Sequence, residues 1–201
     1  MKGFGDLYKS EKKKNKFSNE QIINQAIEFH LKGNIKEAAK YYQILITKST
    51  NNPSIYCNYG AILQSQGKLK EAELSYRKAI DLNPDFAEAH SNLGNILRDL
   101  GKLQDAEIST RKAIELNPDF AEAHSNLGNI LRDLGKLQDA EISTRKAIEL
   151  NPNCIEAHYN LGNILRNLGK LQDAEISTRK AIELNPDFAE AHSNLGNILR
   201  D

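Results

Sequence analysis

Four histidines recur at equal spacing along the chain, which makes them the first candidates for metal chemistry. Each lies 34 residues from the next, and together they are His90, His124, His158 and His192. The ligands of one zinc ion must converge to within about 2.0–2.3 Å of it. Equivalent positions on stacked helices lie roughly 8–10 Å apart. The equal spacing therefore argues against a shared metal, and we interpret the histidines as packing or interface residues.

The other reactive side chains form no recognisable catalytic group. Cys57 and Cys154 are separated by almost three of these intervals, beyond the roughly 7 Å between Cα atoms that a disulfide allows. Neither belongs to a CxxC pair, and the sequence lacks glycine-rich phosphate loops and the motifs HExxH and GxSxG. Carboxylates such as Asp105 and Glu107 have the pattern of solvated helix-surface charges. The sequence thus predicts a protein that is not an enzyme and that uses no metal or cofactor.

The interval of 34 residues governs most of the chain and not the histidines alone. Glycines and prolines keep the same spacing, namely Gly94, Gly128, Gly162 and Gly196, and Pro84, Pro118, Pro152 and Pro186. A fixed period of this size indicates that each unit is one supersecondary element stacked on its neighbour. Such a chain builds an elongated surface rather than one closed core with a pocket. This organisation favours a function that depends on binding along the surface.

Each unit has the pattern of two helices. In residues 87–120, apolar side chains over residues 89–100 fall at helical spacing, and Gly101 can adopt the left-handed conformation that ends a helix. A second apolar stripe covers residues 103–116. Pro118 ends it, because proline cannot continue the helical hydrogen-bond ladder. We therefore expect an all-α chain built of antiparallel helix pairs.

The turn between successive pairs carries a capping signal. Asp119 follows the proline, and Glu122 comes three residues later, which is the spacing of a capping box. We expect the aspartate to be the N-cap of the helix that follows. The same arrangement recurs as Asp85 with Glu88 and as Asp187 with Glu190.

The small and apolar positions of one unit resemble those of the tetratricopeptide repeat. The residues that carry the resemblance are His90-x-x-Leu93-Gly94-x-x-Leu97, then Ala106-x-x-x-Thr110, Ala113 and Pro118. The resemblance covers residues 19–201, with complete repeats at 19–52, 53–86, 87–120, 121–154 and 155–188 and a first helix alone at 189–201. It implies an α-solenoid wound into a right-handed superhelix. The lysine-rich residues 1–18 before it are expected to form a basic, flexible tail.

Two positions depart from the family pattern. The family's large aromatic residue at the start of the first helix is Tyr56 in one repeat but histidine in the later ones. The bulky position on the second helix is tyrosine early in the chain and threonine later, the residues being Tyr42, Tyr76, Thr110, Thr144 and Thr178. These changes concern how tightly the later repeats pack and leave the predicted fold unchanged.

One polar stripe on the first helix indicates a binding function. Glu88, Asn92, Asn95 and Asp99 share one helix face. The resemblance places this face in the concave groove, because first helices line the groove of tetratricopeptide arrays. Two rows of asparagine then follow the groove. The first row is Asn58, Asn92, Asn126, Asn160 and Asn194, with Asn24 at the same position, and the second is Asn95, Asn129, Asn163 and Asn197.

An asparagine row can hold the main chain of a peptide partner. The side-chain amide offers donors and an acceptor together. Repeats stacked about 10 Å apart match about three residues of extended chain at roughly 3.3 Å each. The first row resembles the asparagine ladder in the repeat domain of O-linked N-acetylglucosamine transferase, which clamps peptide main chains. In the early repeats, the second-row position is occupied by Ala61 and Ile27 instead of asparagine. Alternatively, the asparagines bond only to neighbouring helices or water.

Charge and hydropathy exclude several partners. The chain has zero net charge, 39 % hydrophobic residues and no apolar stretch long enough for a membrane span. It begins without a secretory signal. Lysines gather near the N-terminus without the aromatic or arginine pattern of a nucleic-acid site, the residues being Lys9, Lys12, Lys13, Lys14 and Lys16. We expect a cytoplasmic protein that binds neither nucleic acid nor membranes. Arg98, Arg132 and Arg166 are expected to pair with neighbouring acids.

The sequence therefore predicts a scaffold that binds extended segments of a protein or peptide partner in the concave groove. A competing hypothesis is the N-terminal recognition block of a longer glycosyl- or sulfotransferase, since long bacterial arrays of this appearance often precede such domains. A third is a structural array that self-associates. The last helix keeps Leu195, Ile198 and Leu199, which inside an array would pack on following helices. We expect either a fragment of a longer array or association through this end.

Overall fold

The computed structural model describes residues 18–48 and 50–200, and within them the chain forms helices and no strands. The basic N-terminal lysines lie outside the described residues. None of the described helices is long and apolar enough to cross a membrane. The first helices of the repeats are α2 (Asn19–Leu31), α4 (Pro53–Ser65), α6 (Ala87–Asp99), α8 (Ala121–Asp133), α10 (Ile155–Asn167) and α12 (Ala189–Ile198). The second helices are α3 (Ile35–Thr47), α5 (Leu69–Leu82), α7 (Leu103–Leu116), α9 (Leu137–Leu150) and α11 (Leu171–Leu184).

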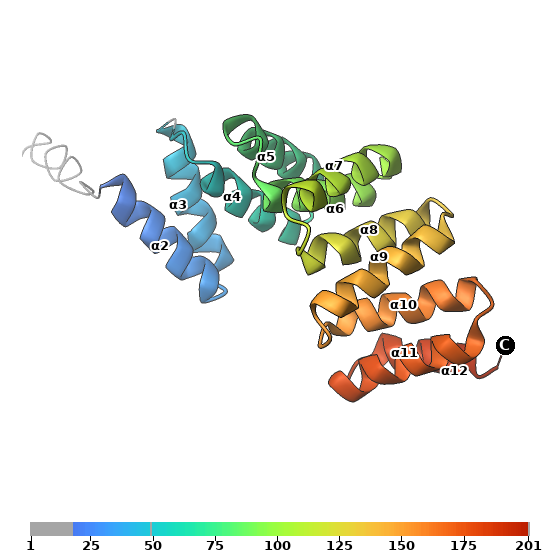
Figure 1. Cartoon of the computed structure of the whole chain (residues 1–201). Coiled ribbons are helices and arrows are strands. Elements are labelled where there is room, and N and C mark those ends of the chain that lie inside the picture. The colour runs from blue at the N-terminus through green and yellow to red at the C-terminus, as the bar shows by residue number, and fades with distance from the viewer. Residues whose placement is uncertain (1–17, 49, 201) are drawn as a thin grey trace, which may run out of the picture.

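The helix pairs follow one another along a curved path from α2 and α3 at one end to α11 and α12 at the other (Figure 1). The first helices α2, α4, α6, α8 and α10 pack on the second helix of their own repeat, and from α4 onward each also contacts the first helix of the next described repeat, as α6 does with α7 and α8. Each second helix contacts first helices on both sides. Because equivalent elements lie closest on the inner side of a curve, the first helices line the concave face. The predicted all-α solenoid is confirmed.

A glycine in the left-handed region closes every described helix pair. The φ angle of Gly101 is 75°, as predicted, and that conformation lets the chain reverse within a few residues. The same conformation recurs at Gly33, Gly67, Gly135 and Gly169. The proline turn ends the second helix as predicted, because α7 stops at Leu116, two residues before Pro118.

The prediction that aspartates cap the first helices is wrong. The N-cap of α8 is Phe120, and no side chain caps this helix. The asparagine before the proline makes the turn bond instead, as where Asn83 Oδ1 accepts from the main-chain N–H of Asp85 at 3.2 Å. This Asx turn places Asp85 one residue before the N-cap of α6, which is Phe86, and Asp119 likewise lies one residue before the N-cap Phe120. Glu122 is consequently not held in a capping box.

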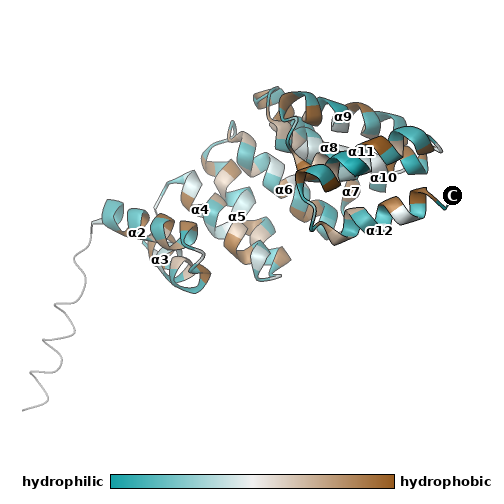
Figure 2. Ribbon diagram, turned by 90° about the horizontal axis from the view of Figure 1, so that it is seen from below, coloured by the Kyte–Doolittle hydropathy of each residue, from teal (hydrophilic) through white to brown (hydrophobic). Residues whose placement is uncertain are grey.

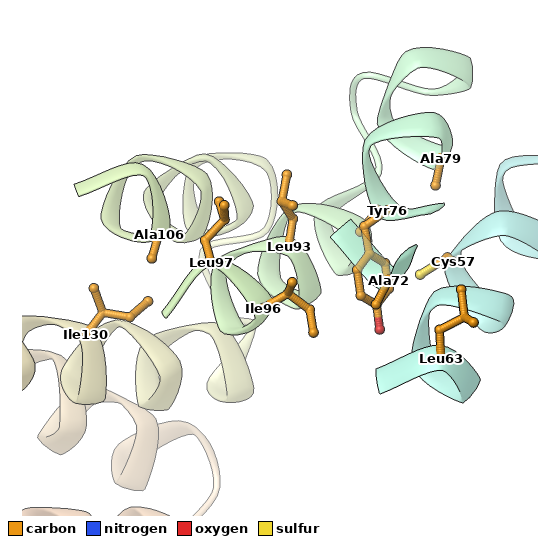
Figure 3. Packing of buried hydrophobic residues seen from close by; sticks show 11 residues of the cluster. Cys57, Leu63, Ala72, Tyr76, Ala79, Leu93, Ile96, Leu97, Ala106 and Ile130 are labelled. Carbon is orange, nitrogen blue, oxygen red and sulfur yellow. The ribbon is translucent and has the colours of Figure 1, made fainter. Parts of the chain in front are cut away.

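Alternation of small and large side chains builds the core. Tyr76 of α5 is fully buried and lies among Cys57, Leu63, Leu93 and Ile96 from the neighbouring first helices (Figure 3). Hydrophilic and hydrophobic residues alternate along every helix, consistent with one buried and one exposed face (Figure 2). The helices are therefore held by packing of their apolar stripes.

The later repeats pack closely despite having threonine in place of tyrosine. Thr110, Thr144 and Thr178 are all fully buried. A Cβ atom added to Gly94 would lie 2.0 Å from Thr110 Oγ1, so only glycine allows this approach of α6 to α7. The threonine repeats thus pack as closely around the glycine as the tyrosine repeat does at Gly60, where an added Cβ would lie 2.8 Å from the ring of Tyr76.

The last helix, α12, exposes less apolar side-chain surface than the sequence suggested. Ile198 is only 4 % exposed because it packs against Leu161, Leu165 and Ala174 of the preceding pair. Leu199 is 60 % exposed, and Leu195 is half-buried. The exposed apolar surface at this end is thus smaller than expected, and self-association through it stays a prediction.

Glutamates on the second helices link successive repeats. Lys136 Nζ lies 2.7 Å from Glu107 Oε2, and Arg111 on the same helix as Glu107 contacts Oε1 at 2.9 Å. Lys102 with Glu73 and Lys170 with Glu141 repeat the link at 2.8 and 2.6 Å. The hydrogen bond from lysine is the main reason that the pKa of each carboxyl is below its ordinary value.

We expect these links to make stability depend on acid pH. Because the pKa of each carboxyl is lower in the folded chain than the value of about 4.3 in the unfolded chain, the stabilisation is complete above that pH. It is lost as the pH falls through the folded pKa. The variant Glu73→Gln/Glu107→Gln/Glu141→Gln should lose about 1–2 kcal/mol at pH 7, since solvent screens these pairs, and match the parent near pH 2.5. Urea unfolding at both pH values measures the difference.

A matched control is Glu115→Gln/Glu149→Gln/Glu183→Gln. These carboxylates pair only with a lysine three residues earlier, and their side chains are 68–70 % exposed. We expect little change at either pH. An equal loss in the two triple variants at pH 7 would contradict a special role for the links between repeats.

Candidate binding groove

A cavity of about 740 Å³ lies along the face of the first helices. It extends from Gln64 at the end of α4 to Glu190 on α12, so five successive first helices contribute to its wall. We call this cavity the groove. Its lining includes the amides of Asn95, Asn126, Asn129 and Asn160 and the carboxylates of Asp99, Glu122, Glu156 and Glu190. Arg98 is the cation of the lining, and Tyr159 and Phe188 are the large aromatic residues.

Four of the eight predicted site asparagines line the groove together. They are Asn126 and Asn160 from the first row and Asn95 and Asn129 from the second. The other four, Asn58, Asn92, Asn163 and Asn194, do not belong to its lining. The structure therefore brings two middle members of the first row and the first two members of the second row into one site.

Three first-row asparagines donate a hydrogen bond to a side chain of the preceding repeat. Asn126 Nδ2 donates to Ser91 Oγ of α6 at 3.1 Å, and Asn92 Nδ2 donates to Cys57 Sγ at 3.6 Å. Asn194 Nδ2 donates to Thr178 Oγ1 at 3.4 Å. The alternative of bonding to neighbouring helices thus holds for these three. In each of these bonds the amide nitrogen is used and the amide oxygen is not.

Asn160 and Asn129 differ from these residues. Asn160 is only 9 % exposed, and within the described part of the chain its side chain makes no hydrogen bond. Of these two residues, only Asn129 has a polar atom, Oδ1, that is fully buried without a partner among the described residues, whereas the amide of Asn160 still reaches solvent. A buried polar atom that makes no hydrogen bond costs roughly 1–3 kcal/mol, so a ligand that satisfies it gains this energy.

Two aromatic residues of the groove were not anticipated from the sequence. The rings of Tyr159 on α10 and Phe188 before α12 lie with their centroids 5.0 Å apart. Tyr159 occupies the position that is Ser91, Ser125 and Ser193 in the other late repeats. The replacement of serine by tyrosine at this position is the sequence signal from which Tyr159 could have been identified.

The arginines beside the groove are held by carboxylates. Arg98 Nη2 lies 3.1 Å from Asp99 Oδ1, and Arg98 Nε lies 3.9 Å from Asp133 Oδ2 in the next repeat. Arg132 contacts Asp133 at 2.9 Å. The predicted pairing with neighbouring acids is confirmed for Arg98 and Arg132.

The recurring histidines make structural hydrogen bonds. His90 Nε2 lies 2.9 Å from the carbonyl oxygen of Pro84. Because a carbonyl only accepts, Nε2 carries the hydrogen and is unavailable to a metal. The same bond of 2.8–2.9 Å joins His124 to Pro118, His158 to Pro152 and His192 to Pro186. The packing interpretation is thereby supported, and no cluster of potential metal ligands occurs among the described residues.

Both cysteines are free thiols. Burial raises the pKa of Cys57 to about 11, against the weaker effect of its bond from Asn92. The thiol is therefore protonated at neutral pH and serves as an acceptor between repeats. It has the environment of a structural residue and not of a nucleophile.

The solenoid and its open polar groove define a protein-interaction scaffold built of helical repeats. Residues 87–120, 121–154 and 155–188 each match the tetratricopeptide repeat, and residues 60–101 match a second TPR repeat description. The protein belongs to the tetratricopeptide repeat family. The three matched ranges have the same bounds as the repeats expected from the sequence.

Several solved structures share this fold. MamA is 25 % identical with a TM-score of 0.68, over 82 % of this chain and 96 % of that one. TTC0263, a protein of Thermus thermophilus, is 17 % identical with a TM-score of 0.74, over 92 % and 100 % of the two chains. YrrB, described as a TPR protein with an unusual peptide-binding site, is 23 % identical with a TM-score of 0.67, over 96 % and 97 %. Comparison with curated proteins gave no match.

Proposed function

We propose that the protein binds extended peptide segments in the groove and holds their main chain through the groove asparagines. The observation that carries this proposal is the pair Asn126 and Asn160. They stand one repeat apart in the groove wall and are 8 % and 9 % exposed. Asn126 is fixed in orientation by Ser91 with its oxygen outside that bond, and Asn160 makes no hydrogen bond to the described residues.

A peptide main chain has the complementary groups. Each of its peptide units offers one N–H donor and one carbonyl acceptor, which is what an asparagine amide pairs with. Successive repeats about 10 Å apart correspond to about three residues of extended chain. One asparagine per repeat then meets every third peptide unit and reads no side chain. The peptide-binding site described for the similarly folded YrrB is in keeping with this proposal.

The test is the double variant Asn126→Ala/Asn160→Ala. The probe is a labelled peptide of about 15 residues, long enough for about five repeats, selected from a random library on the parent protein. Its affinity, measured by fluorescence anisotropy, should fall at least tenfold, which corresponds to about 1.4 kcal/mol. Circular dichroism checks that the helices persist.

The matched control is Gln138→Ala/Gln172→Ala, which removes two exposed amides from the second helices α9 and α11. Its affinity for the same peptide should be that of the parent. Unchanged affinity in a folded Asn126→Ala/Asn160→Ala variant would rule out main-chain binding by these residues.

A further inference from the structure

The groove carries one carboxylate per repeat that has no cationic partner. Glu122, Glu156 and Glu190 occupy equivalent positions near the starts of α8, α10 and α12, and all three line the groove. None of the ion pairs between described residues includes any of them. The expected capping boxes do not form, and the one side-chain contact of these glutamates at a helix end is the weak bond that the uncharged Cys154 thiol donates to Glu156 Oε2 at 3.8 Å.

The glutamates of the second helices are different. Glu107 is bound by both Arg111 and Lys136, and Glu73 and Glu141 are neutralised in the same way. The cation of the groove lining, Arg98, is itself held by Asp99 and Asp133. Although the chain has zero net charge overall, the lining of its groove has an excess of negative charge.

The charge of one of these carboxylates, Glu122 on α8, acts across two repeats. Burial is the main reason that the pKa of Tyr76 on α5 is raised; Cys57, which is ionised at the high pH where Tyr76 titrates, raises it further, and Glu122 adds a smaller contribution. A groove between walls of low dielectric constant concentrates such a field toward an approaching ligand.

Each groove carboxylate also stands beside an amide. Glu156 and Asn160 are four residues apart, so they share one face of α10, as Glu122 and Asn126 share one face of α8. Asn160 is nine-tenths buried and without a hydrogen bond among the described residues, which points independently to a ligand at this place. Tyr159 and Phe188, between Glu156 and Glu190 in the sequence, add aromatic faces on which a cation can rest.

We infer that the groove selects extended segments with a lysine or arginine at about every third residue. The inference rests on the proposed function, in which the asparagines hold the main chain. The carboxylate of each repeat then pairs with one basic side chain, and the spacing of the repeats sets the spacing of the basic residues. The partner is thus a basic segment of a protein in extended conformation.

The experiment compares three peptides of about 15 residues with the repeating sequences Lys-Ser-Ala, Gln-Ser-Ala and Glu-Ser-Ala. At an ionic strength of about 0.02 M, the lysine peptide should bind at least tenfold more tightly than the glutamine peptide, and the glutamate peptide more weakly than either. In Glu122→Gln/Glu156→Gln/Glu190→Gln the preference for lysine should disappear, while the affinity for the glutamine peptide changes less than about twofold.

The variant Glu115→Gln/Glu149→Gln/Glu183→Gln removes the same number of charges from exposed positions on α7, α9 and α11 and should keep the preference. An equal loss in both triple variants would overturn the inference, because net charge alone would then explain the preference. A second outcome is that the parent binds the lysine and glutamine peptides equally and that Asn126→Ala/Asn160→Ala binds neither. This result would overturn the selection for basic residues but would still support main-chain binding. Affinities that do not change in the asparagine variant would overturn main-chain binding and with it this inference.

Discussion

The Tyr76→Ala variant is expected to lose about 3–5 kcal/mol of unfolding free energy, the range for removal of a buried aromatic side chain. Tyr76 is fully buried where α4, α5 and α6 meet, and its ring fills the space among Cys57, Leu63 and Leu93 (Figure 3). A Cβ added to Gly60 would lie 2.8 Å from the ring, so the neighbouring backbone already touches it. Equilibrium unfolding in urea, followed by circular dichroism, measures the loss.

The control for this prediction is Tyr76→Phe. It keeps the ring and removes only the hydroxyl, which donates to Gln64 Oε1 at 3.2 Å. We expect a loss of about 0.5–1.5 kcal/mol, the usual net value of one hydrogen bond. If the two variants lost the same free energy, the hydroxyl and not ring packing would explain the role of Tyr76.

A second large effect is expected from Gly128→Ala. A Cβ at this position of α8 would lie 2.1 Å from Thr144 Oγ1 and 3.3 Å from the carbonyl oxygen of Ala140 on α9. Thr144 cannot turn away freely, because its hydroxyl donates to that carbonyl at 2.9 Å and the residue is fully buried. Overpacking of this kind costs about 1–3 kcal/mol. Urea unfolding should show a net loss despite the better helix propensity of alanine.

The chain offers a matched control at the equivalent glycine of the last repeat. Gly196 on α12 has no atom within 4 Å of an added Cβ. Gly196→Ala should therefore stabilise the chain by up to about 1 kcal/mol, the difference in helix propensity. The opposite signs of the two substitutions are the test, and a stabilising Gly128→Ala would refute the close packing of α8 on α9. Adding Thr144→Ala to Gly128→Ala should recover much of the loss.

The sequence was most informative where a residue acts on its own backbone. Gly101 and Pro118 were correctly assigned to helix ends, because a left-handed φ and a missing N–H restrict the chain within a few residues. Asp119 was assigned wrongly because two local motifs compete there. In the equivalent turn at Asn83, the asparagine before the proline forms a turn bond with the N–H of Asp85, and the N-cap is the residue after the aspartate, Phe86 there and Phe120 here.

The repeat period, by itself, determined the family, the helix pairs and the face on which both asparagine rows lie. That was possible because the same short pattern recurs at equivalent positions of successive repeats, so each repeat supports the same assignment. Only the tertiary structure decided which asparagines gather in the groove, which amides are already bonded, and which carboxylates lack a cation. Those properties depend on contacts between repeats, such as that of Asn126 with Ser91 on the preceding first helix, 35 residues earlier in the chain. Asn126 and Asn160 occupy equivalent positions, each 35 residues after a serine, yet only Asn126 bonds to that serine, and a sequence pattern does not contain the distances that decide this.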